Sequence, residues 1–168
     1  FCEAPNLLKS SPDRPMTNPC VGTELTTDFD TTNFPEPRQR KLGLYAEDLL
    51  IQWLSLASDY SLLAHDLVIQ GEQRTLGALD LIVDTPTGAE HWELALKFYL
   101  GIGGRNWEHW VGPSIKDSLQ KKMTRVDHHQ LKLSAHPIAL QRLADHGIVQ
   151  PLSVKFMLKG MFFAPWGK

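Results

Sequence analysis

The stretch LGALDLIVDTPTGAEHWELALKFYL, residues 76–100, decides the fold that we predict for this chain. From residue 91 to residue 100 an apolar side chain alternates with a more polar or smaller one, which gives an extended strand one apolar face and one face with the charges. The first half is almost uniformly apolar around Asp80, as in a strand covered on both faces. The tripeptide Pro-Thr-Gly at residues 86–88 supplies a turn. The stretch therefore predicts two strands paired as a hairpin.

Two carboxylates face each other in this predicted hairpin. Asp80 and Glu93 lie on neighbouring strands, where cross-strand side chains are about 5 Å apart. Carboxylates this close repel unless a proton or a cation lies between them, and a hard divalent ion suits oxygen ligands. The alternative for Glu93 and Lys97 is a surface ion pair at i and i+4 of a helix. We favour the strand, because a helix would scatter the apolar positions around its circumference.

The composition is that of one globular domain. The 168 residues are 42% hydrophobic and 21% charged, which is ordinary for a chain with a core of its own. The formal net charge is −2, so any contact with nucleic acid must come from a local basic patch. Cys2 and Cys20 lack further Cys or His at metal-ligand spacing, which argues against a disulfide scaffold and a zinc site. A reducing cytoplasm is the simpler assumption.

The sequence predicts neither a membrane span nor a signal peptide within these residues. No apolar run approaches the roughly 18 residues of a membrane span, and the N-terminus lacks the basic and apolar regions of a signal peptide. The start at Phe1 without a Met is compatible with a fragment of a longer protein. Six prolines and many short polar residues predict that residues 1–40 are an irregular segment, with the domain proper in residues 41–168.

A helix with a carboxylate on its apolar side is expected at residues 42–56. The helical period places four residues on one inward stripe: Leu44, Glu47, Ile51 and Leu54. A Glu at the edge of the stripe that reaches water or Arg40 is equally compatible with this pattern. Residues 60–70 are expected to form the loop and strand that lead into the hairpin.

A second helix is expected after a glycine-rich loop that follows the hairpin. Pro113 and Ser114 open it, with Ser114 as N-cap, and its inward stripe is predicted to contain Ile115, Leu119, Met123, Val126, Gln130 and Leu133. Its basic residues, which are usual on a solvated face but here follow the carboxylate strand, are Lys116, Lys121, Lys122 and Arg125. A short helix at residues 137–146 and a strand, or two, at residues 152–164 complete the order.

Five blocks of sequence carry a resemblance to a known family. They are LGLYAEDLL, TLGALDLIV, HWELALKFYLG, WVGPSIKD and DHHQL, in this order, within about residues 41–165. The chain resembles an uncharacterised bacterial family of the PD-(D/E)xK nuclease-like superfamily. The resemblance implies an α/β fold with a restriction-endonuclease-like αβββαβ core, in which a mixed central sheet is flanked by helices.

The resemblance also implies a catalytic site and its cofactor. Asp80 and Glu93 would bind Mg²⁺ or Mn²⁺, Glu47 would support the metal site, and Lys97 would orient or help deprotonate the attacking water. The residues implied to lie along the path of a nucleic acid, DNA more than RNA, are Lys116, Lys121, Lys122, Arg125 and Gln130. A metal ion can lower the pKa of bound water and neutralise charge that develops on a phosphodiester.

One position departs from the pattern of the superfamily. The lysine usually follows the acid by two residues, where this chain has Ala95, and Lys97 comes two residues later on the same strand face. The Cα atoms of Glu93 and Lys97 are expected about 13 Å apart, so Lys97 must lean back over Ala95 or the strand must bulge. The alternative is a module of the same fold that has lost hydrolysis and binds nucleic acid or a protein partner.

Overall fold

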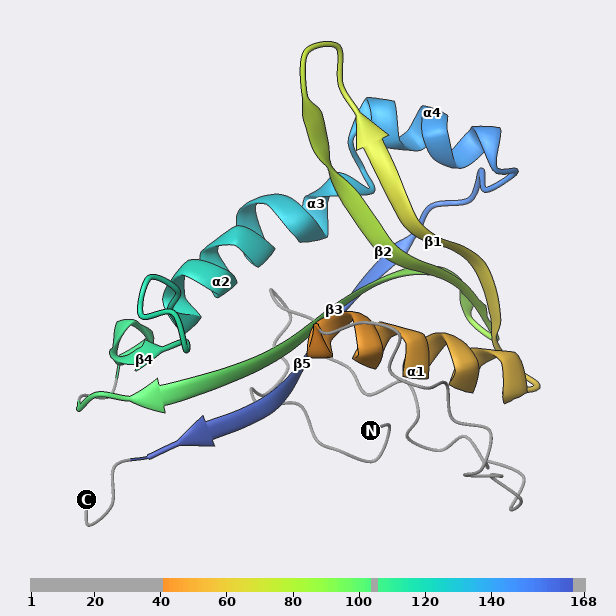
Figure 1. The fold of residues 1–168 in the computed structure, drawn as a ribbon. Helices are drawn as coiled ribbons and strands as arrows, with labels where there is room; N and C mark the ends of the chain where they lie inside the picture. The colour runs from red at the N-terminus through yellow and green to blue at the C-terminus, as the bar shows by residue number, and fades with distance from the viewer. Residues whose placement is uncertain (1–40, 104–105, 165–168) are drawn as a thin grey trace.

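A sheet of five strands forms the centre of the structure, a computed structural model that describes residues 41–103 and 106–164. The expected irregular segment at residues 1–40 and both cysteines lie outside the described residues. The strands are β1 (Ser61–Gln70), β2 (Thr75–Thr85), β3 (Gly88–Gly101), β4 (Trp110–Val111) and β5 (Ser153–Phe163). Their order is β1-β2-β3-β4, and β5 lies along β3 (Figure 1). Because β5 runs parallel to β3 and the other pairs are antiparallel, the sheet is mixed.

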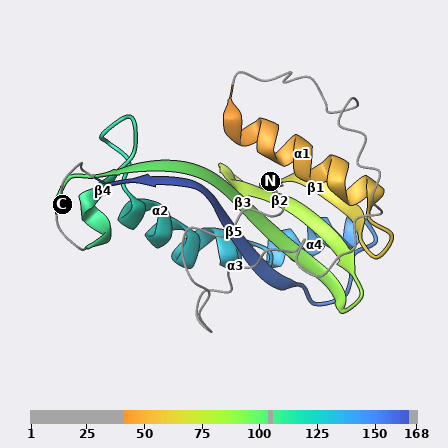
Figure 2. The ribbon, with the colours of Figure 1, turned by 90° about the horizontal axis from the view of Figure 1, so that it is seen from below.

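Helices cover both faces of this sheet (Figure 2). One face carries α1 (Leu42–Leu56), and the other carries α2 (Leu119–Arg125), α3 (Leu131–Leu133) and α4 (Pro137–Asp145). A 3₁₀ turn, η2 (Trp107–His109), precedes β4, and a π turn, η3 (Val126–Gln130), joins α2 to α3. The predicted α/β class with a mixed, helix-flanked sheet is confirmed. None of the described helices has the length and apolar character that a membrane crossing requires.

The predicted hairpin is present as β2 and β3. Its register runs from Thr85 opposite Gly88 to Leu81 opposite Trp92. In the turn, Thr85 Oγ1 accepts a hydrogen bond from Thr87 N and donates one to Gly88 O, at 3.2 and 2.8 Å. Residues 152–164 contribute one strand, β5, rather than a pair, because its pairing with β3 continues without a break from Ser153 to Phe163.

The inward stripe of α1 differs from the prediction. Its buried residues are Ala46, Leu50, Trp53 and Leu54. Leu44 is 38% exposed, because the helix turns the large Trp53 ring toward the sheet, where it packs 5.4 Å from the Tyr60 ring. Burying an indole removes more apolar surface from water than burying the leucine near the helix start. Glu47 consequently lies at the edge of the stripe and is partly buried. Arg40, its alternative partner, lies outside the described residues.

The second helix begins later than predicted. It starts at Leu119, and Ser118, not Ser114, is the N-cap, with Oγ accepting from Lys121 N at 3.3 Å. Residues 112–117 form a loop instead, because Gly112 N donates to Asp117 O at 3.0 Å and closes it. Ile115 therefore does not belong to the inward stripe. The rest of the apolar stripe is buried as predicted: Leu119, Met123, Val126 and Leu133.

Candidate active site

The candidate site lies where β2 and β3 separate. Their pairing ends at Leu81 and Trp92, beyond which β2 stays paired with β1 while β3 continues along β5 (Figure 1). Asp80 is the next residue of β2, and its Oδ2 accepts a hydrogen bond from Leu94 N at 2.9 Å. A backbone N–H that loses its strand partner needs another acceptor. The Asp80 carboxylate takes that place and is thereby fixed at the fork between the strands.

Glu93 extends from β3 into the protein interior and is fully buried. Its Oε1 lies 3.1 Å from His91 Nε2, and its Oε2 accepts a hydrogen bond from Gln130 Nε2 at 2.7 Å. His91 is also fully buried. A buried carboxylate is costly unless its oxygens are hydrogen-bonded, so these two partners account for the presence of Glu93 in the core.

The three acidic residues predicted from the sequence share one electrostatic field. Burial and the charge of Glu93 raise the pKa of Asp80 to about 7, and Glu47 adds to this effect. Burial also raises the pKa of Glu47, together with the charges of Asp66, Asp48 and Glu93. The structure therefore places Glu47, Asp80 and Glu93 within electrostatic range of one another, with an excess of negative charge that a proton or a cation would relieve.

The lysine that interacts electrostatically with Asp80 is Lys122, and the predicted Lys97 has another partner. Lys97 Nζ binds Asp117 Oδ2 at 2.9 Å, with both side chains about one-third exposed. Lys122, on α2, is the cation whose charge lowers the pKa of Asp80. Burial lowers the pKa of Lys122 itself, while Glu93 and Asp80 favour its charged form. The Lys122 ammonium also lies 5.7 Å from the centroid of the Phe156 ring.

A bridging amide joins Lys122 to the carboxylates. Lys122 Nζ donates to Gln130 Oε1 at 2.8 Å, and the same amide donates to Glu93. Lys122 and Gln130 are eight residues apart, which would place them about 80° apart around an α-helix. The π turn η3 adds one residue to a helical turn and removes about 90° of that rotation, so both side chains face the site. Sequence reasoning singled out Gln130 as a polar residue on the inward stripe, but it missed this position of Lys122.

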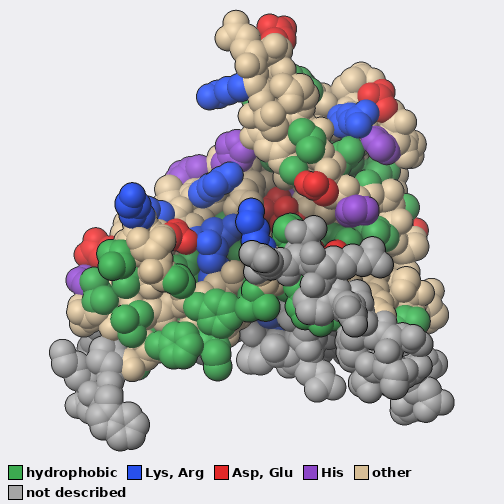
Figure 3. Space-filling model, in the orientation of Figure 1, with side chains coloured by type: hydrophobic (Ala, Val, Ile, Leu, Met, Phe, Trp, Pro, Cys, Tyr) green, Lys and Arg blue, Asp and Glu red, His purple; other side chains and the backbone are tan. Residues whose placement is uncertain are grey.

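The remaining basic residues lie on the solvent side of α2 and of the loop before it. Lys116, Lys121 and Arg125 are exposed, and Lys121 Nζ donates to Lys116 O at 2.8 Å. Figure 3 shows Lys and Arg side chains gathered over α2, with carboxylates beside them where β2 and β3 meet. The five residues predicted to bind nucleic acid therefore divide into three on the surface and two, Lys122 and Gln130, that face the acids.

Comparison with known proteins gives one match. The sequence model of a family described as a domain of unknown function, DUF1853, matches residues 1–168. The chain belongs to the DUF1853 family. No curated protein and no solved structure matches it.

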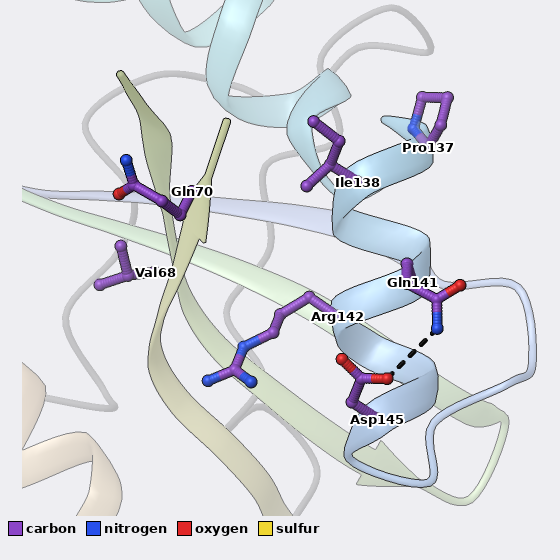
Figure 4. A pocket seen from close by; sticks show the side chains of 7 residues that line it. All are labelled: Val68, Gln70, Pro137, Ile138, Gln141, Arg142 and Asp145. Atoms are coloured by element: carbon purple, nitrogen blue, oxygen red, sulfur yellow. Dashed lines mark hydrogen bonds between the residues drawn. The ribbon is translucent and has the colours of Figure 1, made fainter. Parts of the chain in front are cut away.

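The DUF1853 chain has a hollow of about 680 Å³ that is separate from the acids (Figure 4). It lies between β1 and α4, and Val68, Ile138 and Arg142 are among the residues that line it. Gln141 and Asp145, on its α4 side, are joined by a hydrogen bond of 3.2 Å. None of the candidate catalytic residues lines this hollow, so it takes no part in the site at the fork.

The carboxylates of this DUF1853 chain suit a magnesium ion by their chemistry. Among the described residues, no three His, Cys, Asp or Glu side chains are grouped as ligands of one metal ion. Mg²⁺ is commonly held by only one or two carboxylates, with water and substrate oxygens as the other ligands. Asp80 and Glu93 meet that requirement, and the pKa of Asp80 is raised by burial and by the charge of Glu93, both of which a bound cation would offset. The donor set therefore fits the metal ion that the sequence resemblance implies.

Proposed function

We propose that this DUF1853 domain hydrolyses phosphodiester bonds of nucleic acid with the help of Mg²⁺ or Mn²⁺. The observation that carries the proposal is the position of Asp80 at the β2–β3 fork, bonded to Leu94 N next to Glu93, with Lys122 joined to Glu93 through the Gln130 amide. The order α1, β1, β2, β3, α2, β5 agrees with the αβββαβ core implied by the PD-(D/E)xK resemblance. The restriction-endonuclease-like fold and the superfamily membership are part of this proposal.

Asp80 and Glu93 would hold the metal ion, and Glu47 would add negative charge near it. When bound, the ion supplies a water of lowered pKa and neutralises charge on the phosphodiester. The protein contributes fixed ligand positions, since Leu94 N holds Asp80 and the pair His91 and Gln130 holds Glu93. Ligands that are already in place need no reorganisation during the reaction.

Lys122 is the residue that we assign to the phosphate. Its ammonium group is partly desolvated and is positioned by Gln130, so its charge is less screened by water and acts more strongly on a neighbouring phosphate. We assign it the stabilisation of negative charge that develops on the scissile phosphate. Lys97, held by Asp117, would support the loop before α2 and add positive charge around Lys122.

Cleavage assays with DNA and RNA test the proposal. The wild-type chain and the variants Asp80→Asn and Asp84→Asn are incubated with labelled single- and double-stranded substrates, in Mg²⁺, Mn²⁺ or EDTA. Asp84 is an exposed aspartate of the same strand and is the matched control. We expect metal-dependent cleavage, of DNA more than RNA, that Asp80→Asn reduces about 100-fold or more and Asp84→Asn retains. Equal background activity in the wild type and Asp80→Asn over all substrates would reject hydrolysis.

A second function is favoured by one specific observation. Both oxygens of Glu93 already accept hydrogen bonds within the protein, and Ala95 stands where the superfamily has its lysine. In a non-catalytic module of the same fold, Glu93 would serve only as a hydrogen-bonded residue of the core, and no catalytic lysine would be needed at position 95. Such a module would bind nucleic acid or a protein partner. Binding of nucleic acid that is unaffected by metal, with no cleavage, would support this second function.

A further inference from the structure

The loop before α2 presents an aliphatic side chain to solvent. Ile115 is 80% exposed and has φ of +61°, in the left-handed region. Glycine and asparagine are the usual residues there, because a β-branched side chain clashes with its own backbone. Ile115 thus combines an unfavourable backbone conformation with a side chain that gains little from burial. This combination often accompanies a functional contact.

Hydrogen bonds fix this conformation. Ile115 N donates to Gly112 O at 2.9 Å, and Gly112 N donates to Asp117 O at 3.0 Å. The Asp117 carboxylate binds Lys97 of β3, and Lys97 lies close enough to Lys122 to lower its pKa. The loop that carries Ile115 is therefore tied to the strand beside the candidate active site.

Ile115 lines a hollow of about 730 Å³ on the outer side of α2. The same hollow is lined by the cationic side chains of Lys121 and Arg125, by the His128 imidazole, by the hydroxyls of Ser118 and Thr124, and by one carboxylate, Glu108. Cations and hydroxyls suit the phosphates of a nucleic acid, whereas the aliphatic tip suits the apolar face of a base. Lys121 and Lys122 are neighbours in sequence, so the hollow and the acids lie on adjacent sides of one helix.

We infer that Ile115 is a wedge that enters a base step of a bound duplex and unstacks it, while Lys121 and Arg125 hold the phosphates on either side. Apolar side chains of this size unstack base steps in other nucleic-acid-binding proteins. This inference rests on the proposed function, because it assumes that the ligand is a nucleic acid. It adds that the ligand is a stacked duplex that is distorted on binding.

Binding in EDTA to duplexes with 2-aminopurine at successive positions tests the wedge without any cleavage. The Asp80→Asn protein should raise the 2-aminopurine fluorescence at one step, because unstacking relieves quenching. Adding Ile115→Gly should abolish this rise and weaken binding about tenfold, with an unchanged dependence on salt. Adding Lys121→Ala and Arg125→Ala should instead reduce the salt dependence. Val149→Gly, which removes a β-branched side chain that is 79% exposed, is the control and should change neither.

The thermal stability of the same variants excludes an indirect effect. Glycine is favoured at positive φ, so Ile115→Gly should unfold at the same or a higher temperature than its parent. A lower melting temperature of Ile115→Gly would show that Ile115 packs in the fold and would overturn the inference. Unchanged binding and fluorescence in Ile115→Gly, or a wild type that binds no duplex, would also overturn it. Cleavage by the wild type is measured separately. If the wild type cleaves DNA but Ile115→Gly does not change binding, only the wedge is rejected. If Ile115→Gly changes binding and fluorescence as expected but the wild type does not cleave, only hydrolysis is rejected.

Discussion

Replacing Asp80 by Asn should stabilise the protein at alkaline pH. The pKa of Asp80 is raised from its usual value of 3.8 to about 7, chiefly by burial and by Glu93. Between these two values the folded protein binds a proton that the unfolded chain has released. The stability of the wild type should therefore be highest below the unfolded pKa and should fall as pH rises through about 7. Asn carries no charge at any pH, and its Oδ1 can still accept the hydrogen bond from Leu94 N.

The magnitude follows from the same two pKa values. A difference of about three pKa units corresponds to at most about 4 kcal/mol, at 1.36 kcal/mol per unit. Asp80 is partly exposed, and solvent screening reduces this to about 2 kcal/mol. At pH 8 Asp80→Asn should therefore melt about 4–8 °C above the wild type, with almost no difference at pH 4.

Thermal unfolding followed by circular dichroism in EDTA measures this difference. Asp84→Asn, an exposed position of the same strand, should show no comparable dependence on pH. Mg²⁺ should stabilise the wild type at pH 8, and this stabilisation should be lost in Asp80→Asn because binding to the folded state raises its stability. A melting-temperature difference between Asp80→Asn and wild type that is the same at pH 4 and pH 8 would refute the reasoning.

Three further predictions concern the side chains around the acids. In single-turnover cleavage, Lys122→Met should reduce the rate about 100-fold or more, whereas Lys97→Met should reduce it less than about tenfold; the reverse order would return the catalytic role to Lys97. Gln130→Ala should lower the free energy of unfolding in urea by about 1–3 kcal/mol, because Glu93 loses a hydrogen bond in the core, and an unchanged midpoint would show that this bond contributes nothing. Lys121→Ala with Arg125→Ala should reduce the slope of the logarithm of the DNA-binding constant against the logarithm of salt concentration by about 2, and Arg142→Ala, on α4, should leave that slope unchanged.

The sequence predicted those parts of the fold that have a simple period. Alternation from residue 91 to residue 100 identified β3, and the short turn after β2 set the register, whose last pair, Leu81 and Trp92, leaves Asp80 and Glu93 at the fork between the strands. The start of the second helix was wrong because residues 113–117 show no local feature that rules out a helix. Their loop depends on the hydrogen bond from Gly112 to Asp117.

The position of Lys122 beside the acids could not be predicted from the sequence for a physical reason. Lys97 lies on the same strand as Glu93, so the strand pattern of the superfamily points to Lys97. Lys122 is close to the acids because α2 packs against β3, and η3 brings Gln130 to the same side, where its amide binds Lys122. A π turn has no hydrophobic period of its own, and such a contact between distant segments is visible only in three dimensions.

Metal binding tests the central claim most directly, because it needs no choice of substrate. Mn²⁺ titration followed by electron paramagnetic resonance should show binding to the wild-type chain at pH 8, competed by Mg²⁺. Asp80→Asn should lose this binding, and the control Asp84→Asn should retain it. No binding by the wild type, or equal binding by the wild type and Asp80→Asn, would contradict a metal site at the β2–β3 fork.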